Sequence, residues 1–251
     1  MQIHALWCHP RSISTAFERI MRERGDLDVL HEPFMYHHYL TRSDRLFTDF
    51  EPEGGHPTTY NDIRQMILER SRAGPLFFKD MAYYVEADLP QDPDFARAMT
   101  HAFLVRDPAE SIVSYHRRDP DFTREELGHI SQLKLYERLA TQGHKPLVLT
   151  ADQLRAAPEA TLKRYWSHIG LAFVAHAFSW QPDMPKAWQP VAAWHDRAVA
   201  SGRIEASDEQ QDSRFALQQL GAPYTDYDRI HRPAYESLRQ VALSQEEASG
   251  S

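Results

Sequence analysis

The sequence predicts a single α/β domain of three layers, in which a central parallel sheet of about five strands lies between helices. Short apolar runs alternate with segments of helical period, which is typical of strands joined by crossover helices. The first run, 3–8, is apolar nearly throughout, as expected for a strand covered on both faces. The chain has 251 residues, enough for one sizeable core. We therefore expect one domain over residues 1–251.

The strands of this sheet are predicted from short apolar runs that end in polar or charged residues. The run at 76–81, for example, carries Lys79 and Asp80 at its end, and the run at 102–106 ends in Arg106. Such lengths are ordinary for strands of a parallel sheet. The five predicted strands span residues 3–8, 29–34, 76–81, 102–106 and 146–150.

The helices are predicted from capping signals and apolar stripes. Thr15 and Glu18 have the spacing of a capping box, which predicts a helix beginning near Thr15. Asn61 is expected to cap the next helix, and Asp107 followed by Pro108 predicts another helix start. The predicted helices cover 15–24, 62–73, the segment after Asp107, 123–142, 159–169 and 233–243, with a long loop at 35–59 and a disordered tail at 246–251.

Composition excludes several classes of function. The net charge of −8 argues against a general nucleic-acid binder, which needs a basic excess. The single cysteine, Cys8, excludes an intramolecular disulfide and makes a cysteine-based zinc site unfavourable. No apolar run approaches the roughly 18–20 residues of a membrane span. We expect a cytoplasmic monomer or homodimer that binds no metal, no nucleic acid and no membrane.

Polar side chains follow four of the predicted strands. They are Arg11 and Ser12 after the first strand, Glu32 after the second, Lys79 and Asp80 at the third, and Arg106 after the fourth. Ligands of open parallel sheets bind at the carboxyl ends of the strands, where these residues fall. The sequence therefore predicts one site at this edge of the sheet.

The segment between the first strand and the first helix has the features of an anion site. A loop in this position collects backbone N–H groups and the positive end of a helix dipole. Arg11 adds a fixed cation, and Ser12, Ser14 and Thr15 add hydroxyl groups. The segment lacks the G-x-x-x-x-G-K-[ST] pattern of a nucleoside-triphosphate loop. An ordinary strand-to-helix turn capped by Thr15 is the alternative.

A second anion-binding pair is expected after the fourth strand. Arg106 ends that strand, and Ser114 lies about two turns into the following helix, so the two side chains could meet on one side of a pocket. A pair of this kind can hold a second, separate phosphate. A structural arginine with a solvated serine is the alternative.

Together these stretches resemble the cofactor site of the sulfotransferases that use 3′-phosphoadenosine 5′-phosphosulfate (PAPS). In that family a P-[RK]-S-G-[ST]-[ST] loop binds the 5′-phosphosulfate and an R-x-P-x-x-x-x-x-S stretch binds the 3′-phosphate. The matching segments here are 10–15 and 106–114, and 148–171 is similar to a later strand, turn and helix of the family. The resemblance covers about residues 3–171, and is nearer to carbohydrate-type and bacterial members than to the cytosolic small-molecule enzymes. Residues 172–245 are then a helical and irregular C-terminal part.

The resemblance implies in-line, metal-independent transfer of a sulfuryl group from PAPS to a hydroxyl or amine of a small-molecule acceptor, with adenosine 3′,5′-bisphosphate as product. Arg11 is expected to stabilise the developing charge and Glu32 to act as the general base. Asp80 is the second candidate base, and Lys79 is expected to steady the leaving sulfate. Structural roles are the alternative for these charged residues. The implied cofactor-binding residues are His9, Pro10, Arg11, Ser12, Ile13, Ser14, Thr15, Arg106 and Ser114.

One departure from the family pattern concerns the centre of the loop. Ile13 stands where the family usually has glycine, and a β-branched residue would be strained there if the position needs a positive φ. Two other functions therefore stay open: a P-loop kinase-like phosphotransferase and a non-catalytic nucleotide-binding protein. Arg197 and Arg203 are loose candidates for closing on the 3′-phosphate. We expect 35–59 and 178–202 to shape the acceptor pocket.

Overall fold

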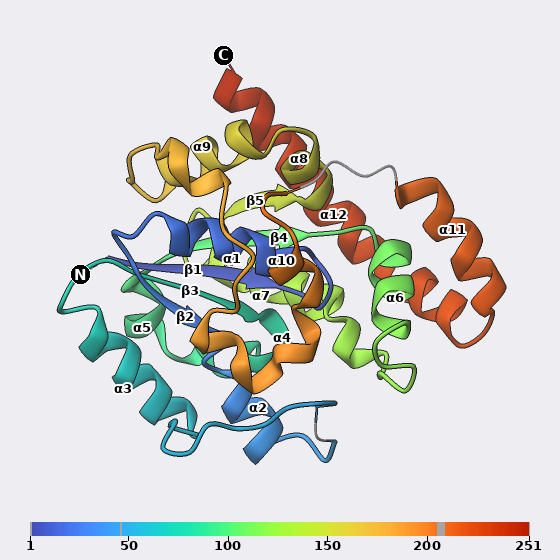
Figure 1. Ribbon diagram of the computed structural model, residues 1–251, viewed down its shortest axis with the longest axis horizontal. Coiled ribbons are helices and arrows are strands. Elements are labelled where there is room, and N and C mark those ends of the chain that lie inside the picture. The colour runs from blue at the N-terminus through green and yellow to red at the C-terminus, as the bar shows by residue number, and fades with distance from the viewer. Residues whose placement is uncertain (1, 46, 205–208, 251) are drawn as a thin grey trace.

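A five-stranded parallel sheet forms the centre of the computed structural model, which describes residues 2–45, 47–204 and 209–250 (Figure 1). The strand order is β2-β3-β1-β4-β5, and all neighbouring strands pair in parallel. The strands are β1 (Ile3–Cys8), β2 (Asp28–His31), β3 (Leu76–Met81), β4 (Met99–Val105) and β5 (Leu147–Thr150). The predicted fold class and the five predicted strands are thus confirmed, although β4 begins three residues earlier than expected and β2 ends at His31, three residues before the expected end.

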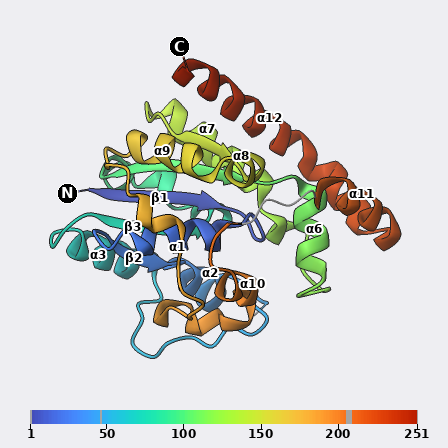
Figure 2. The same cartoon turned by 45° about the horizontal axis from the view of Figure 1, so that its top comes forward.

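Helices cover both faces of the sheet. Phe17 of α1 (Ser14–Glu23) packs edge-on against Tyr165 of α9 (Pro158–His168), with ring centroids 4.9 Å apart. These two helices therefore lie on the same face of the sheet. In Figure 2 the long last helix, α12 (Tyr224–Gly250), runs along one side of the molecule, where it contacts α6 (Pro108–His116) and α7 (His129–Thr141). The α-helices are α1 (Ser14–Glu23), α2 (Met35–Thr41), α3 (Tyr60–Arg70), α4 (Ala82–Val85), α5 (Pro93–Arg97), α6 (Pro108–His116), α7 (His129–Thr141), α8 (Ala151–Ala156), α9 (Pro158–His168), α10 (Asp196–Ala200), α11 (Glu209–Leu220) and α12 (Tyr224–Gly250). The described residues also form the 3₁₀ helices η1 (Leu89–Gln91), η2 (Glu125–Leu127), η3 (Ala175–Phe178) and η4 (Lys186–Trp194).

The central strands are buried on both faces, as their composition predicts. Every residue of β1 and of β3 is buried, including the charged Lys79 and Asp80. Their apolar side chains join the single hydrophobic core that the helices cover. Burying a charge costs free energy unless the charge is paired. The end of β3 is therefore a candidate for part of a functional site.

Two predicted helices, 62–73 and 123–142, differ from the helices in the structure. The helix expected at 62–73 spans Tyr60–Arg70, because Thr59 and not Asn61 caps it by accepting a hydrogen bond from the backbone N–H of Asp62. The helix expected at 123–142 is divided into η2 and α7 at Gly128, whose φ is 77°. A Cβ atom at Gly128 would lie 3.2 Å from the Cβ of His9, so both conformation and space favour glycine.

The C-terminal part is more helical than expected. Helix α12 spans Tyr224–Gly250 with Pro233 inside it, so it is much longer than the predicted 233–243 and continues through most of the tail expected to be disordered. Ser251 lies outside the described residues. The loop predicted at 35–59 contains α2, and α11 was not predicted. Weak apolar periodicity hid these helices, which gain stability from packing against α4 and α6.

Candidate functional site

The loop between β1 and α1 combines two left-handed residues. Arg11 and Ile13 both have φ of 62°, and Ile13 is the N-cap of α1 without a side-chain capping bond. The capping box expected between Thr15 and Glu18 is therefore not formed. Left-handed residues between right-handed ones turn successive N–H groups toward one concave side, which suits an anion. A β-branched residue in this conformation costs roughly 1–2 kcal/mol, so the expected strain at Ile13 is present.

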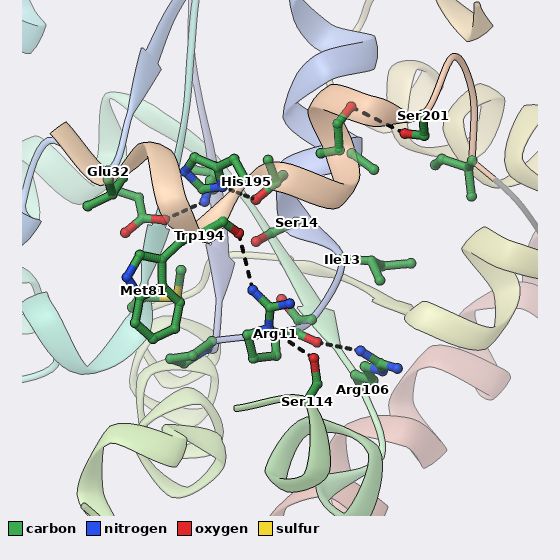
Figure 3. Close-up of a pocket in the computed structure, with 18 of the residues that line it drawn as sticks. Arg11, Ile13, Ser14, Glu32, Met81, Arg106, Ser114, Trp194, His195 and Ser201 are labelled. Carbon is green, nitrogen blue, oxygen red and sulfur yellow. Dashed lines mark hydrogen bonds and ion pairs between the residues drawn. The ribbon is translucent and has the colours of Figure 1, made fainter. Parts of the chain in front are cut away.

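A pocket opens beside this loop at the carboxyl edge of the sheet (Figure 3). Residues from the loop, from the ends of β2, β3 and β4, from α6 and from the segment at 191–204 line it. The structure thus brings together most of the predicted site residues: Pro10, Arg11, Ser12, Ile13, Ser14, Thr15, Glu32, Lys79, Arg106 and Ser114. Arg203 lines the same pocket, whereas the side chain of Arg197 lies outside what the structure describes.

Two neighbouring arginines line the pocket beside the loop. Arg11 donates from Nε to Ser114 Oγ at 2.9 Å and from Nη1 to the carbonyl of Trp194 at 3.2 Å. Arg106 donates from Nη1 to the carbonyl of Arg11 at 2.8 Å. Ser114 is therefore held by Arg11, and not by Arg106 as the spacing suggested. The hydrogen bonds fix both guanidinium groups beside the anion loop (Figure 3).

A buried carboxylate positions Arg106 together with an arginine that sequence reasoning missed. Glu110 Oε2 accepts from Arg106 Nε at 2.7 Å and from Arg155 Nη1 at 2.8 Å. Arg155 comes from α8 and also lines the pocket. The four-residue spacing of Arg106 and Glu110 is visible in the sequence. Arg155 lies much later in the chain, and no sequence motif links it to this pair.

Two predicted site residues do not line the pocket that the described residues form. His9 is fully buried, accepts a hydrogen bond from the backbone N–H of Arg106 at 2.9 Å, and packs against His129 with ring centroids 3.8 Å apart. Burial holds the pKa of His9 well below its usual value, so the ring is neutral and able to accept. His9 therefore supports Arg106 from behind, which corrects the expectation that it contacts a cofactor.

Asp80 is also turned away from the pocket. Its carboxylate accepts from the backbone N–H groups of Phe34, at 2.8 Å, and of Met81, at 3.2 Å. Burial, with the nearby charge of Glu32, raises the pKa of Asp80 well above its usual value. Its position corrects the expectation that Asp80 is an alternative general base, because an acceptor in the pocket does not reach it.

Glu32 and Lys79 form a buried ion pair on the pocket wall. Lys79 Nζ donates to Glu32 Oε1, and the two side chains are only 1% and 7% exposed. Burial alone would lower the pKa of Lys79, but Glu32 and Glu18 outweigh burial and raise it. Glu32 itself has a φ of 42° where the chain leaves β2. The fold thus holds one carboxylate and one ammonium group at the floor of the pocket.

Next to this pair runs a line of polar side chains that the sequence did not reveal. Glu18 Oε2 lies 2.6 Å from His31 Nδ1, His31 Nε2 lies 3.1 Å from His195 Nε2, and His195 Nδ1 lies 3.2 Å from Thr15 Oγ1. Glu18 also accepts from Trp188 Nε1 at 2.8 Å. The line runs from a fully buried carboxylate to a hydroxyl group on the pocket wall.

Apolar side chains also line the pocket. Trp194 stacks on Phe47 with centroids 4.2 Å apart and donates from Nε1 to the carbonyl of Thr48 at 2.7 Å. Met81, Tyr84 and Val191 line the same pocket. Residues of the segments 35–59 and 178–202 thus meet at the pocket. The sequence predicts that these two segments shape the acceptor pocket.

Two further findings concern metals and membranes. Within the part of the chain that the structure describes, no three histidine, cysteine, aspartate or glutamate side chains are grouped to hold a metal ion. Among the described helices, none combines the length and apolar character needed to cross a membrane.

Comparison with known proteins identifies the family. Residues 1–210 match the family described as "Sulfotransferase domain". The chain belongs to the sulfotransferase domain family. The sulfotransferase domain from the curacin biosynthetic pathway has the same fold, with a TM-score of 0.54, 13% identity and coverage of 97% of this chain and 96% of that one. A sulfotransferase from Alicyclobacillus acidocaldarius has a TM-score of 0.51, 12% identity and coverage of 94% and 98%.

Two curated relatives from Arabidopsis thaliana are longer proteins. Branched-chain-amino-acid aminotransferase-like protein 2 is 27% identical over 186 residues, which are 71% of this chain and 32% of that protein. Branched-chain-amino-acid aminotransferase-like protein 1 is 25% identical over 245 residues, which are 94% of this chain and 41% of that protein. The chain therefore spans less than half the length of these relatives. The comparisons establish its membership of the sulfotransferase domain family.

Proposed function

We propose that this chain transfers a sulfuryl group from PAPS to a hydroxyl or amine group of a small molecule with an apolar body. One observation carries the proposal. The left-handed loop with Arg11, the arginine at the end of β4 and the Glu32–Lys79 pair all line one pocket. Membership of the sulfotransferase domain family supports the reaction class.

The residues of the pocket fit a donor that carries several separate anionic groups. Ser12 Oγ, in the loop itself, is buried and has no hydrogen-bond partner among the described residues. Its hydroxyl can therefore donate a hydrogen bond to a bound anion. Arg11 and Arg106 bring two fixed cations to the loop. Forked guanidinium groups suit phosphate and sulfate oxygens. When bound, PAPS would supply a sulfuryl group joined to a phosphate and a second phosphate on the ribose.

The chain's own residues divide the chemical work. Arg11 and the N–H groups of the loop are placed to hold and neutralise negative charge as it develops on the leaving phosphate oxygen. Glu32 would take the proton of the acceptor hydroxyl, and Lys79 Nζ, which donates to Glu32, would neutralise charge on the transferred sulfate. The apolar wall at Phe47 and Trp194 suits the body of the acceptor.

A binding experiment tests the donor. We expect adenosine 3′,5′-bisphosphate to raise the melting temperature more than ATP with Mg²⁺ does. Arg106→Ala should weaken bisphosphate affinity by about tenfold or more, because it removes a charge-assisted hydrogen bond. Arg229→Ala is the matched control, since that exposed side chain of α12 pairs with Asp226. Stabilisation by ATP with Mg²⁺ alone would favour a kinase-like phosphotransferase and overturn the proposal.

A transfer experiment tests the reaction and the acceptor. Labelled PAPS offered with a panel of alcohols and amines should label acceptors with apolar bodies. Glu32→Gln should lower the rate constant for transfer while the affinity for the bisphosphate changes little. Bisphosphate binding without transfer to any acceptor would favour a non-catalytic nucleotide-binding protein. We also propose that the protein is cytoplasmic, which cell fractionation tests. We propose that it is a monomer or a homodimer, which size-exclusion chromatography tests.

A further inference from the structure

Arg45 is not among the described residues that line the pocket, yet two buried carboxylates hold it in place. Its Nη1 donates to Glu126 Oε1 at 2.6 Å and to Glu126 Oε2 at 2.7 Å, and its Nη2 donates to Asp119 Oδ2. We propose that Arg45 is a positioning residue that sets which acceptors the protein prefers, because it fixes Phe47 and Trp194 in the pocket. The inference rests on the proposed function, since its ligand is the acceptor of that reaction.

The two carboxylates are held by their own stretch of chain. Asp119 Oδ1 accepts from the backbone N–H of Asp121 at 3.2 Å, and Glu126 Oε2 accepts from that of Thr123 at 2.7 Å. Asp119 and Glu126 are only 4% and 6% exposed, and buried charges are costly unless they are paired. Burial alone would lower the pKa of Arg45, but Asp119 and Glu126 outweigh burial and raise it. A forked guanidinium group bound to two fixed carboxylates has a defined orientation, so the chain at Arg45 is fixed as well.

Thr48 fixes the chain on the other side of Phe47. Its Oγ1 donates at 3.1 Å to Asp119 Oδ2, the same oxygen that Arg45 binds. Phe47 therefore lies in the sequence between two residues that are bonded to one buried carboxylate. Phe47 is itself buried and packs on Tyr39 with ring centroids 5.1 Å apart.

The same stretch of chain fixes Trp194. Trp194 Nε1 donates to the backbone carbonyl of Thr48 at 2.7 Å, and its ring stacks on Phe47 with centroids 4.2 Å apart. Both aromatic side chains line the pocket that also contains Glu32. Through these contacts Arg45 determines where an aromatic surface lies in the pocket, without lining the pocket itself.

The link from Arg45 to the anion loop is less direct. Arg11 binds Trp194 through the backbone carbonyl, at 3.2 Å, and not through the ring (Figure 3). Arg11 is also held by Ser114 Oγ at 2.9 Å. Loss of Arg45 should therefore affect binding of the acceptor more than binding of the donor.

Acceptors of graded length test the inference. With labelled PAPS and unbranched primary alcohols and amines from propyl to octyl, kcat/KM of the wild-type protein should rise by up to about fourfold for each methylene group that becomes buried. Arg45→Gln should make this rise smaller, because Phe47 and Trp194 are no longer fixed, and the loss should lie in KM more than in kcat. The shortest acceptors bury the least apolar surface and should change least. The octyl-to-propyl ratio of kcat/KM compares two substrates of one sample, so it does not depend on the fraction of protein that is folded.

Two further variants separate positioning from a general structural role. Phe47→Ala removes the side chain through which Arg45 is proposed to act. In that background Arg45→Gln should lower the octyl-to-propyl ratio no further, since the two changes remove one and the same interaction. Arg45→Lys keeps the charge but loses the fork, and should give a ratio between those of the wild-type protein and Arg45→Gln.

Neighbouring ion pairs supply the controls. Arg42→Gln removes an arginine three residues away, which pairs with Asp88 at the surface, and should keep the wild-type ratio. Asp49→Asn removes the half-exposed partner of Arg118 and should lower the ratio less than Arg45→Gln does. Arg45→Gln should bind adenosine 3′,5′-bisphosphate with the affinity of the wild-type protein.

The outcomes separate this inference from the proposed function. Equal losses of kcat/KM for the propyl and octyl acceptors in Arg45→Gln, or a wild-type ratio near one, would overturn the inference and leave the proposed function standing. Transfer by the wild-type protein to none of these acceptors, or absence of bisphosphate binding, would overturn both.

Discussion

Ile13 occupies a backbone conformation that suits glycine, at the centre of the anion loop. Its φ is 62°, and its side chain packs against the hydrophobic core while it also lines the pocket. Contact with the core offsets part of the conformational cost, which explains how a β-branched residue is retained there. Strain of this kind persists where surrounding structure holds the backbone in place.

Two truncations of Ile13 separate conformation from packing. Ile13→Ala and Ile13→Gly both remove the contact with the core, but alanine keeps the steric penalty of a left-handed residue. Despite the greater freedom of glycine in the unfolded chain, Ile13→Gly should be the more stable variant, by about 1 kcal/mol. Urea unfolding measures the difference. A more stable Ile13→Ala would show that residue 13 leaves the left-handed region.

The Glu32–Lys79 pair makes a second prediction at this scale. Lys79→Met leaves the Glu32 carboxylate without its ammonium partner in a buried place, which should lower the free energy of unfolding by about 3–5 kcal/mol. The double variant Glu32→Gln with Lys79→Met should lose less than Lys79→Met alone. Lys134→Met, at an exposed pair with Glu86, is the control and should change stability little. Additive losses in the double variant would contradict an energetic coupling between the two residues.

Individual site residues were predictable to different degrees. The anion loop and Arg106 follow from strand-end position and spacing, and the structure brings them together. Strand-end position could not tell which of Lys79 and Asp80 faces the pocket. Neighbouring residues of a strand point to opposite faces, and of these two only Lys79 lines the pocket. Arg155 and His195 were missed because they reach the site from later segments that no local pattern links to it.

At the scale of the elements, α12 protects the edge of the sheet. Within the part of the chain that the structure describes, the edge strand β5 has no further strand to pair with on its outer side. Gln245 Oε1 accepts from the backbone N–H of Val148 at 2.8 Å, and Gln245 Nε2 donates to the carbonyl of Pro146 at 2.9 Å. A side chain of the helix thus continues the hydrogen bonding of the sheet, and exposed strand edges are otherwise prone to pair with other chains.

Replacement of this glutamine tests the arrangement. Gln245→Ala should lower the free energy of unfolding by about 1–3 kcal/mol, because it leaves a partly buried backbone N–H and carbonyl unpaired. Glu246→Ala is the neighbouring control, since Glu246 accepts from Gln153 at the surface. Equal unfolding midpoints for the two variants would show that water replaces Gln245 at no cost.

Among the elements, strands were more predictable than helices. A buried strand of a parallel sheet is apolar along its whole length, and each such run was visible. Helices α2 and α11 have little apolar periodicity and depend on neighbouring elements for stability. Gly128 divides one expected helix because a left-handed turn and a close approach to His9 meet at that position.

At the scale of the whole molecule, buried charges make stability depend on pH. Burial alone would raise the pKa of the Glu18 carboxyl, but His31 and Arg22 overcome burial and hold it well below the ordinary value of 4.5. A lowered pKa in the folded state means that Glu18 contributes stability above the ordinary pKa of its carboxyl. That contribution decreases as the pH falls below this value.

Glu18→Gln should therefore show its largest destabilisation near neutral pH and a smaller one in acid. We expect a loss of about 3–5 kcal/mol at neutral pH, since the change leaves the charged and polar partners of a buried carboxylate without it. Chemical denaturation at neutral pH and below about pH 4.5 measures the difference. A destabilisation that is independent of pH would contradict ionisation of Glu18 in the folded protein.

The position of β1 in the middle of the sheet has a consequence for how such a domain diversifies. To one side lie β3 and β2, whose ends hold Lys79 and Glu32; to the other lie β4 and β5, which lead to Arg106 and to Arg155. In the function proposed above, the segments that would face the acceptor and those that would hold the nucleotide are thus different stretches of chain on the two sides of β1. We expect exchange of the segment at 32–84 between related domains to change which molecule is modified while the affinity for the nucleotide is inherited unchanged.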